Sequence, residues 1–134
     1  MKRSPIVRKT ALVSGAPIKR RSRRKPTSMI RSDAVTQSAR DQPCTLQIAG
    51  FPCAPIDTVV LAHIPLPGNH GGALKPDDLC AAYACATCHD LFDGRQPGLE
   101  HGSADWMFYA LRGMARTLRL MHDAGIITIK GESR

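Results

Sequence analysis

Five cysteines are the residues whose spacing points most directly to chemistry in this chain. Cys85 and Cys88 form a Cys-x-x-Cys pair, a spacing that lets both sulfur atoms bind one tetrahedral metal ion, usually Zn²⁺. A closed structural site needs four ligands, and Cys44 and Cys53 are the obvious second pair because the loop between them can bring both sulfurs to one point. The sequence therefore predicts a structural zinc site made by these four cysteines, with Cys80 as a small buried apolar residue outside it.

Both cysteine pairs also have other interpretations. A Cys-x-x-Cys pair can be a redox pair of the thioredoxin type, but that needs a βαβ setting which this sequence lacks. Cys44 and Cys53 could be two unrelated buried thiols. His89 directly follows the Cys-x-x-Cys pair and could replace one cysteine as a ligand.

His63 is the candidate general base of the chain. It ends a run rich in β-branched residues and lies two positions before Pro65, where a strand that meets a loop can point an imidazole outward. An unperturbed imidazole has a pKa of about 6.5, which suits proton abstraction from water near neutral pH. The alternative for His63 is a hydrogen-bonded structural histidine.

A base that activates water is one of the two parts needed for phosphodiester hydrolysis. The other part is a divalent cation that neutralises the developing charge. His89 and Asp93 are four residues apart and would share one face of a helix, and Asp77, Asp78 and Asp90 lie nearby in the sequence. Imidazole and carboxylate ligands with open positions suit Mg²⁺ or Mn²⁺. We therefore expect His89, Asp93 and Asp78 to bind a catalytic metal ion, although Asp77 and Asp78 could instead cap a helix.

The elements that would position these residues are short. Residues 44–48 alternate like a strand, and residues 59–64 form a second strand candidate. Residues 77–79 could open a helical turn or an extended piece that leads to the Cys-x-x-Cys pair, and residues 88–93 predict a short helix.

The clearest element lies near the C-terminus. Ser103 can cap a helix whose apolar residues recur at three- and four-residue steps, and Gly125 follows its end. Residues 126–129 are β-branched and predict a final strand. The expected apolar face of the helix contains Trp106, Ala110, Leu111, Met114, Leu118 and Met121.

The charge of the chain is divided between two parts. Residues 1–40 contain twelve Lys or Arg residues against one Asp, whereas residues 41–134 contain seven against ten acidic residues. The apolar residues of the first part show no period, so we expect residues 1–40 to be a disordered basic tail and residues 41–134 to be the folded domain. The densest basic block would bind the phosphates of a polyanion such as DNA; the alternative is a solvated tail without a partner. This block contains Lys19, Arg20, Arg21, Arg23, Arg24 and Lys25.

The composition also suggests where the protein works. No stretch has the pattern of a secretory signal, and no apolar run approaches the length of a membrane span. We therefore expect a cytoplasmic protein, in which thiols stay reduced and cysteine pairs more often bind metal than form disulfides. With six aromatic residues, a domain of this size also needs a staple such as a metal site.

The order of these features resembles a known family. A cysteine pair, a hydrophobic stretch ending in His, an Asp-Leu step and a Cys-x-x-Cys-His run resemble HNH endonucleases with a zinc knuckle, in particular the small family of phage and prophage nucleases that includes YbcO. The resemblance covers about residues 41–131. It is carried by residues 44–53, 60–64, 75–79, 84–90 and 111–117.

This resemblance implies a fold and an activity. The fold would be a small α+β, ββα-metal (HNH-like) zinc-stabilised domain with an added C-terminal helix and strand. The protein would be a metal-dependent endonuclease that cleaves DNA phosphodiester bonds, in phage or prophage DNA recombination or processing. His63 would be its general base and His89 a ligand of its catalytic metal. Asp78 stands where the HNH motif has its middle Asn.

One position departs from the HNH pattern in a way that bears on catalysis. Many HNH enzymes carry a metal-binding Asp or His just before the base, and here that position is Ala62. Asp90 or Asp93 could supply the missing oxygen ligand. The departure favours a second hypothesis, a zinc-knuckle protein that binds nucleic acid without catalysis.

That second hypothesis would use the basic tail together with Arg112, Arg116 and Arg119, which fall on other faces of the expected C-terminal helix. A third hypothesis is a phage protein that only binds another protein, and no feature of the sequence supports it positively. The presence of His63 at a strand end, with His89 and Asp93 downstream, favours the endonuclease.

Overall fold

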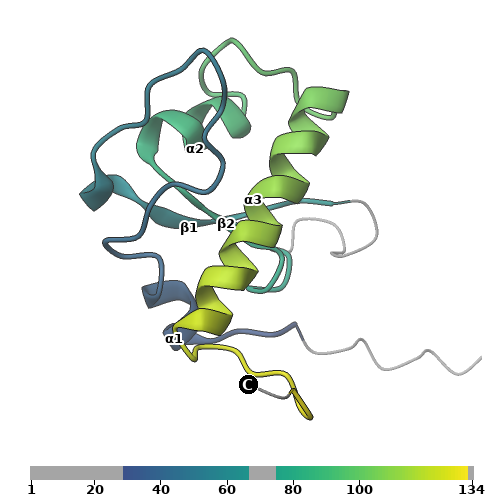
Figure 1. Cartoon of the computed structure of the whole chain (residues 1–134). Helices are drawn as coiled ribbons and strands as arrows, with labels where there is room; N and C mark the ends of the chain where they lie inside the picture. The colour runs from purple at the N-terminus through teal and green to yellow at the C-terminus, as the bar shows by residue number, and fades with distance from the viewer. Residues whose placement is uncertain (1–28, 67–74, 133–134) are drawn as a thin grey trace, which may run out of the picture.

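The computed structural model describes residues 29–66 and 75–132 (Figure 1). The described part is a small α+β fold with one two-stranded sheet and three α-helices. Its elements are α1 (Asp33–Gln37), the 3-10 turn η1 (Ile56–Thr58), β1 (Val60–His63), β2 (Ala81–Ala84), α2 (Ala86–Phe92) and α3 (Ala104–Asp123). None of the helices in this part of the chain has the length and apolarity needed to cross a membrane.

The two strands form an antiparallel hairpin. Val60 pairs with Ala84 and His63 with Ala81. The strand expected over residues 59–64 is therefore confirmed, and the extended piece expected before Cys85 is β2. All four residues of β2 are buried, and α3 packs across this strand (Figure 1).

The long helix begins and ends as the sequence predicts. Ser103 Oγ accepts a hydrogen bond from the Trp106 amide at 3.1 Å, and Gly125 follows the helix with a φ of +70°. Trp106 also holds α2, because its indole N–H donates to the Phe92 carbonyl at 2.9 Å and its ring stacks on the Phe92 ring. These contacts fix the end of α2 against the start of α3.

The buried face of α3 differs from the expected one. Leu111 is 49% exposed, whereas Gly113 and Thr117 are buried between Trp106 and Met121. The reason is the size of the facing side chains. Strand β2 presents mainly alanines, so α3 approaches closely where its own residues are small. A Cβ atom on Gly113 would lie 2.7 Å from a methyl carbon of Leu46 and 3.1 Å from the Ala82 Cβ.

Residues 44–48 do not form the expected strand. The Thr45 amide donates to the Tyr83 carbonyl at 2.8 Å, so this segment does run along β2. The Tyr83 amide, however, donates to the Thr117 hydroxyl at 3.0 Å instead of to a carbonyl of the segment. Gln47 then turns away with a φ of +43°, which ends any ladder after one bond.

The final strand expected at residues 126–129 is also absent from the described structure. The amides of Ile126 and Ile127 both donate to the Met121 carbonyl, which closes the C-terminus of α3. Ile129 is 64% exposed. In the described structure the β-branched residues therefore close the end of α3 and pair with no strand.

The expected boundary at residue 40 falls too late. Helix α1 lies before it, capped by the Ser32 hydroxyl, and its Val35 is buried together with Ala39. Two apolar residues four positions apart are a weak pattern, which is why the sequence did not reveal this helix. The basic block at residues 19–25 lies outside the described residues.

Candidate metal centre and active site

Four cysteines from two separate parts of the chain meet at one point. The Sγ atoms of Cys44, Cys53, Cys85 and Cys88 all lie within 4.8 Å of one another, and those of Cys53 and Cys88 are 3.9 Å apart. Sulfur atoms that share a tetrahedral Zn²⁺ with Zn–S bonds of about 2.3 Å are about 3.8 Å apart, whereas a disulfide requires about 2.05 Å. The four cysteines could therefore hold a metal ion, and their geometry suits one. Cys80 lies outside this cluster, with its sulfur against the Ile64 carbonyl and the Met114 sulfur.

Short local structures bring these sulfurs together. Cys85 caps α2 directly after β2, and Cys88 lies in the first turn of that helix. The Ala86 amide donates to the Thr58 hydroxyl at 3.2 Å, which ties the start of α2 to the chain before β1. The loop that carries Cys44 and Cys53 starts beside β2, where the Thr45 amide donates to the Tyr83 carbonyl at 2.8 Å.

The thiols influence one another strongly. A hydrogen bond from the Cys88 thiol lowers the pKa of Cys44 to about 4. That same bond and burial raise the pKa of Cys88 well above its ordinary value, and burial raises the pKa of Cys53 to about 11. Without a metal ion the site thus favours the thiolate form of Cys44 alone. A bound cation would stabilise the other cysteines as thiolates.

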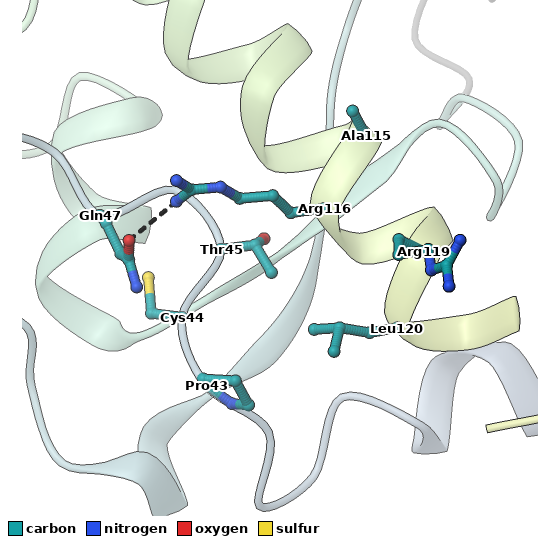
Figure 2. Close-up of a pocket in the computed structure, with 8 residues that line it drawn as sticks. All are labelled: Pro43, Cys44, Thr45, Gln47, Ala115, Arg116, Arg119 and Leu120. Atoms are coloured by element: carbon teal, nitrogen blue, oxygen red, sulfur yellow. Dashed lines mark hydrogen bonds between the residues drawn. The ribbon is translucent and has the colours of Figure 1, made fainter. Parts of the chain in front are cut away.

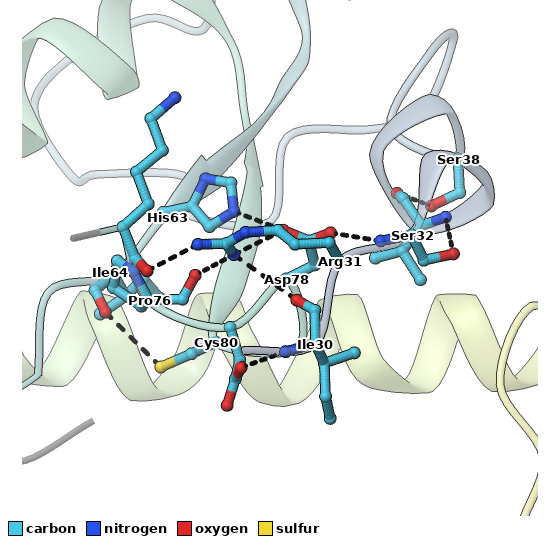
Figure 3. A network of polar contacts seen from close by, with 12 residues as sticks. Ile30, Arg31, Ser32, Ser38, His63, Ile64, Pro76, Asp78 and Cys80 are labelled. Carbon is cyan, nitrogen blue, oxygen red and sulfur yellow. Dashed lines mark hydrogen bonds and ion pairs between the residues drawn. The ribbon is translucent and has the colours of Figure 1, made fainter. Parts of the chain in front are cut away.

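His63 lies at the end of β1 and is held by a carboxylate (Figure 3). Its Nε2 atom is 2.9 Å from Asp78 Oδ1. Burial disfavours the charge on Asp78, but hydrogen bonds from His63, the Ser32 amide and Arg31 outweigh it and hold the pKa of Asp78 below its ordinary value. An ionised carboxylate only accepts hydrogen bonds, so Nε2 must carry the proton. In the neutral ring, Nδ1 then keeps its lone pair, and Figure 3 shows it pointing away from Asp78.

Asp78 is not arranged as a ligand of an exposed metal ion. Its side chain is 4% exposed. Oδ1 accepts from Arg31 at 3.0 Å as well as from His63, and Oδ2 accepts from the Ser32 amide at 2.7 Å. Both oxygens of Asp78 thus accept hydrogen bonds from protein donors. This arrangement suits a carboxylate that orients His63 better than the metal ligand that the sequence predicted.

His89, in α2, and Asp93, which caps the C-terminus of this helix, form a separate pair. Their side chains approach to 3.3 Å, as their four-residue spacing predicts. Arg95 binds Asp93 and also Asp90, at 2.8 Å. In the residues that the structure describes, the four cysteines are the one cluster with three or more metal-binding side chains. His89 and Asp93 are thus brought together, but not with Asp78.

The C-terminal half of α3 borders a groove of about 590 Å³ on the far side of β2 from β1 (Figure 2). Arg116 reaches across it and donates to the Gln47 side-chain oxygen at 2.8 Å, and Arg119 pairs with Asp123 on the next turn. Arg112 is different, because its guanidinium donates to the carbonyls of Leu46 and Gln47. The groove residues are Pro43, Cys44, Thr45, Gln47, Ala115, Arg116, Arg119 and Leu120.

Comparison with known proteins shows the family to which the chain belongs. Residues 33–126 match the family described as "Putative nuclease YbcO". This chain belongs to that family. It is 41% identical over 91 residues to "Putative nuclease YbcO" of Escherichia coli K12. This match covers 68% of this chain and 93% of the relative. The same values hold for "Putative nuclease ybcO" of Enterobacteria phage 82.

A solved structure of similar sequence supports the fold. It is described as "Structure of a putative bacteriophage protein from Escherichia coli str. K-12 substr. MG1655", and is 36% identical with a TM-score of 0.54. The match covers 67% of this chain and 98% of the other. The segment that matches the YbcO family contains all four clustered cysteines together with His63 and Asp78.

The sequence did not reveal two partners of the site. Ser32 and Arg31 lie in the segment expected to be a disordered tail, yet both bond to Asp78. An arginine among twelve basic residues gives no signal of its own, because only a contact 47 residues away along the chain distinguishes it.

Proposed function

We propose that this protein is a metal-dependent endonuclease of the HNH type that cleaves DNA phosphodiester bonds, as part of phage or prophage DNA recombination or processing. The observation that carries the proposal is the His63–Asp78 pair at the end of β1. Membership of a family whose relatives are named nucleases supports it, and so does the order of hairpin, Cys-x-x-Cys pair and helix, which fits a ββα-metal fold.

The chemistry assigned to His63 follows from its hydrogen bond. Asp78 holds the Nε2–H side of the ring, so Nδ1 is the atom that accepts a proton from water. The resulting hydroxide attacks the phosphorus atom, the bond from phosphorus to the leaving ester oxygen breaks, and that oxygen takes up a proton from water. Asp78 stabilises the imidazolium that forms, because its carboxylate is ionised and 2.9 Å away.

Two metal ions have different roles in this proposal. The four cysteines would hold a structural Zn²⁺ that joins the 44–53 loop to α2. His89 and Asp93 would hold Mg²⁺ or Mn²⁺, since their imidazole and carboxylate are adjacent and about a quarter to a third exposed. A divalent ion supplies charge stabilisation to the scissile phosphate when bound.

DNA would be bound by positive charges on two parts of the chain. The basic block at residues 19–25 would neutralise phosphates without reading sequence. The groove beside α3 adds Arg116, whose side-chain hydrogen bond within the described residues goes to the neutral amide of Gln47. Such contacts position a nucleic acid and do not select its sequence.

A second function is favoured by one observation. Ala62, at the position where many HNH enzymes have a metal ligand, is buried at 2% exposure and offers no ligand atom. This favours a zinc-knuckle protein that binds nucleic acid without cutting it.

A plasmid-nicking assay separates the two functions. Full-length protein is incubated with supercoiled DNA and Mg²⁺, Mn²⁺ or EDTA. The endonuclease proposal expects nicking with at least one metal ion and none with EDTA. DNA that is bound but remains intact with every divalent ion would support the binding protein instead.

A further inference from the structure

Residues 30–32 run beside residues 75–78, and hydrogen bonds join the two segments (Figure 3). The Ile30 amide donates to Asp77 Oδ1 at 2.6 Å, and the Ile30 carbonyl accepts from the Asp78 amide at 3.1 Å. The Ser32 amide donates to Asp78 Oδ2 at 2.7 Å. We call residues 30–32 the strap, because they hold a segment more than 40 residues away in the sequence.

Arg31 is the centre of the strap. Its guanidinium donates to the Lys75 carbonyl at 2.7 Å, to the Pro76 carbonyl, and to Asp78 Oδ1 at 3.0 Å. A planar guanidinium can bridge three acceptors in this way, whereas the compact ammonium of lysine lacks the fork geometry. Arg31 therefore fixes both the backbone before Asp78 and the carboxylate itself.

The carboxylate that Arg31 holds is the one that orients His63. Oδ1 of Asp78 accepts from Arg31 and His63 together, and Oδ2 is held by the Ser32 amide. The Asp78 side chain is almost fully buried, whereas His63 is 20% exposed and Arg31 is 45% exposed. The position of His63 thus depends on a carboxylate whose own orientation is set mostly by the strap.

We propose that Arg31 is a positioning residue for His63, acting through Asp78. The catalytic part of this inference rests on the proposed function, but the positioning itself does not. The strap precedes residues 33–126, the segment that matches the YbcO family, so family membership does not imply this role.

A kinetic experiment tests the catalytic part. Plasmid nicking by the full chain is measured under single-turnover conditions over a range of enzyme concentrations. Arg31→Ala should lower the maximal rate about 10- to 100-fold, because small misplacement of a catalytic group costs rates of this order. The half-saturating concentration should change little, since Arg31 acts on His63 and not on DNA affinity. Arg31→Lys should recover part of the rate.

Arg40→Ala is the matched control, since it removes the same charge from an exposed residue shortly after α1. Its maximal rate should equal that of the wild type. A wild-type maximal rate for Arg31→Ala, or a defect confined to half-saturation and shared with Arg40→Ala, would overturn the proposal and make Arg31 an ordinary cation for DNA.

Nitrogen NMR of the His63 ring tests positioning without substrate, so it decides the matter even if the wild type cuts no DNA. The wild-type ring should be a single Nε2–H tautomer whose proton exchanges slowly. Arg31→Ala should mix the tautomers and speed exchange about tenfold or more, with Arg31→Lys in between. Since Arg31 is half-exposed, the variants should fold, which amide spectra will check. An unchanged tautomer and exchange rate in both variants would refute the positioning role.

Discussion

At the scale of single residues, two sets of side chains carry the account. The four cysteines were predicted from spacing, and the structure places their sulfurs together. The partner of His63 was not predicted, because Asp78 was expected to bind metal and instead accepts three hydrogen bonds. Spacing in the sequence reveals ligands that share one short motif, but not the donors that arrive from a distant segment.

The zinc proposal predicts different results for two cysteines that lie five residues apart. Cys85→Ser should remove bound zinc and leave the protein unfolded or insoluble, since structural zinc contributes about 10 kcal/mol or more to folding in small zinc domains. Cys80→Ser is the control and should keep one zinc per chain, because its sulfur contacts the Ile64 carbonyl outside the cluster. Zinc content measured by mass spectrometry and thermal melting checks both. Full stability in a zinc-free Cys85→Ser protein would contradict the structural role.

The lowered pKa of Asp78 predicts a pH dependence of stability. A carboxyl whose folded pKa is depressed stabilises the fold above its unfolded value of about 3.9, and this contribution is lost as the pH falls through the lower folded value. The Asp78→Asn protein should therefore have a lower free energy of unfolding than the wild type at pH 7, by about 1–3 kcal/mol, because hydrogen bonds to a charged group are lost. The difference should shrink towards pH 3. A gap between the two proteins that stays constant with pH would show that the charge of Asp78 does not stabilise the fold.

At the scale of elements, the sequence predicted β1, α2 and the limits of α3, but not how they pack. Caps and periodicity are local signals, which is why Ser103 and Gly125 were recognised. The buried face of α3 depends on β2, whose alanines admit Gly113 and Thr117. Residues 44–48 have the pattern of a strand. They would have paired with β2 through the Tyr83 amide, but this amide donates to the Thr117 hydroxyl instead. Contacts between elements decided each of these outcomes.

Gly113→Ala tests the close contact of α3 with the sheet. In an exposed helix this change would stabilise by about 1 kcal/mol. Here the added methyl group meets Leu46 and Ala82, so we expect a net destabilisation of about 1–3 kcal/mol, as for other overpacked cores. Ala115→Gly, at an exposed position of the same helix, is the reverse control and should cost about 1 kcal/mol. Denaturant unfolding measures both, and a Gly113→Ala protein more stable than the wild type would contradict the packing described.

At the scale of the whole molecule, a basic segment precedes a slightly acidic folded part. The folded part begins before Asp33, earlier than the composition suggested, because α1 and the strap both pack on it. The coarse fold class, small α+β, was predicted through the resemblance that the cysteine and histidine motifs carry. The boundary was not, since a five-residue helix among basic residues has almost no periodic signal.

Deletion of residues 1–28 tests whether the basic segment binds DNA. The deletion removes ten Lys or Arg residues and no acid, and it keeps the strap and α1. Each phosphate contact contributes a slope of about −0.9 to the dependence of log affinity on log salt for duplex DNA. The truncated protein should therefore bind more weakly and with a shallower slope, and the slope that remains would report contacts such as those of Arg116. An unchanged slope would show that the segment does not touch DNA.

The central claim is that His63 is the general base of an endonuclease, and one measurement tests it most directly. The nicking rate of His63→Ala is compared with that of the wild type and of His101→Ala, an exposed histidine far from Asp78 in the sequence. We predict that His63→Ala cuts about 10²–10⁴ times more slowly, the usual cost of removing a general base, while its zinc content and DNA affinity stay unchanged. His101→Ala should cut normally. A His63→Ala protein that nicks DNA at the wild-type rate would contradict the claim and make the His63–Asp78 pair a structural contact.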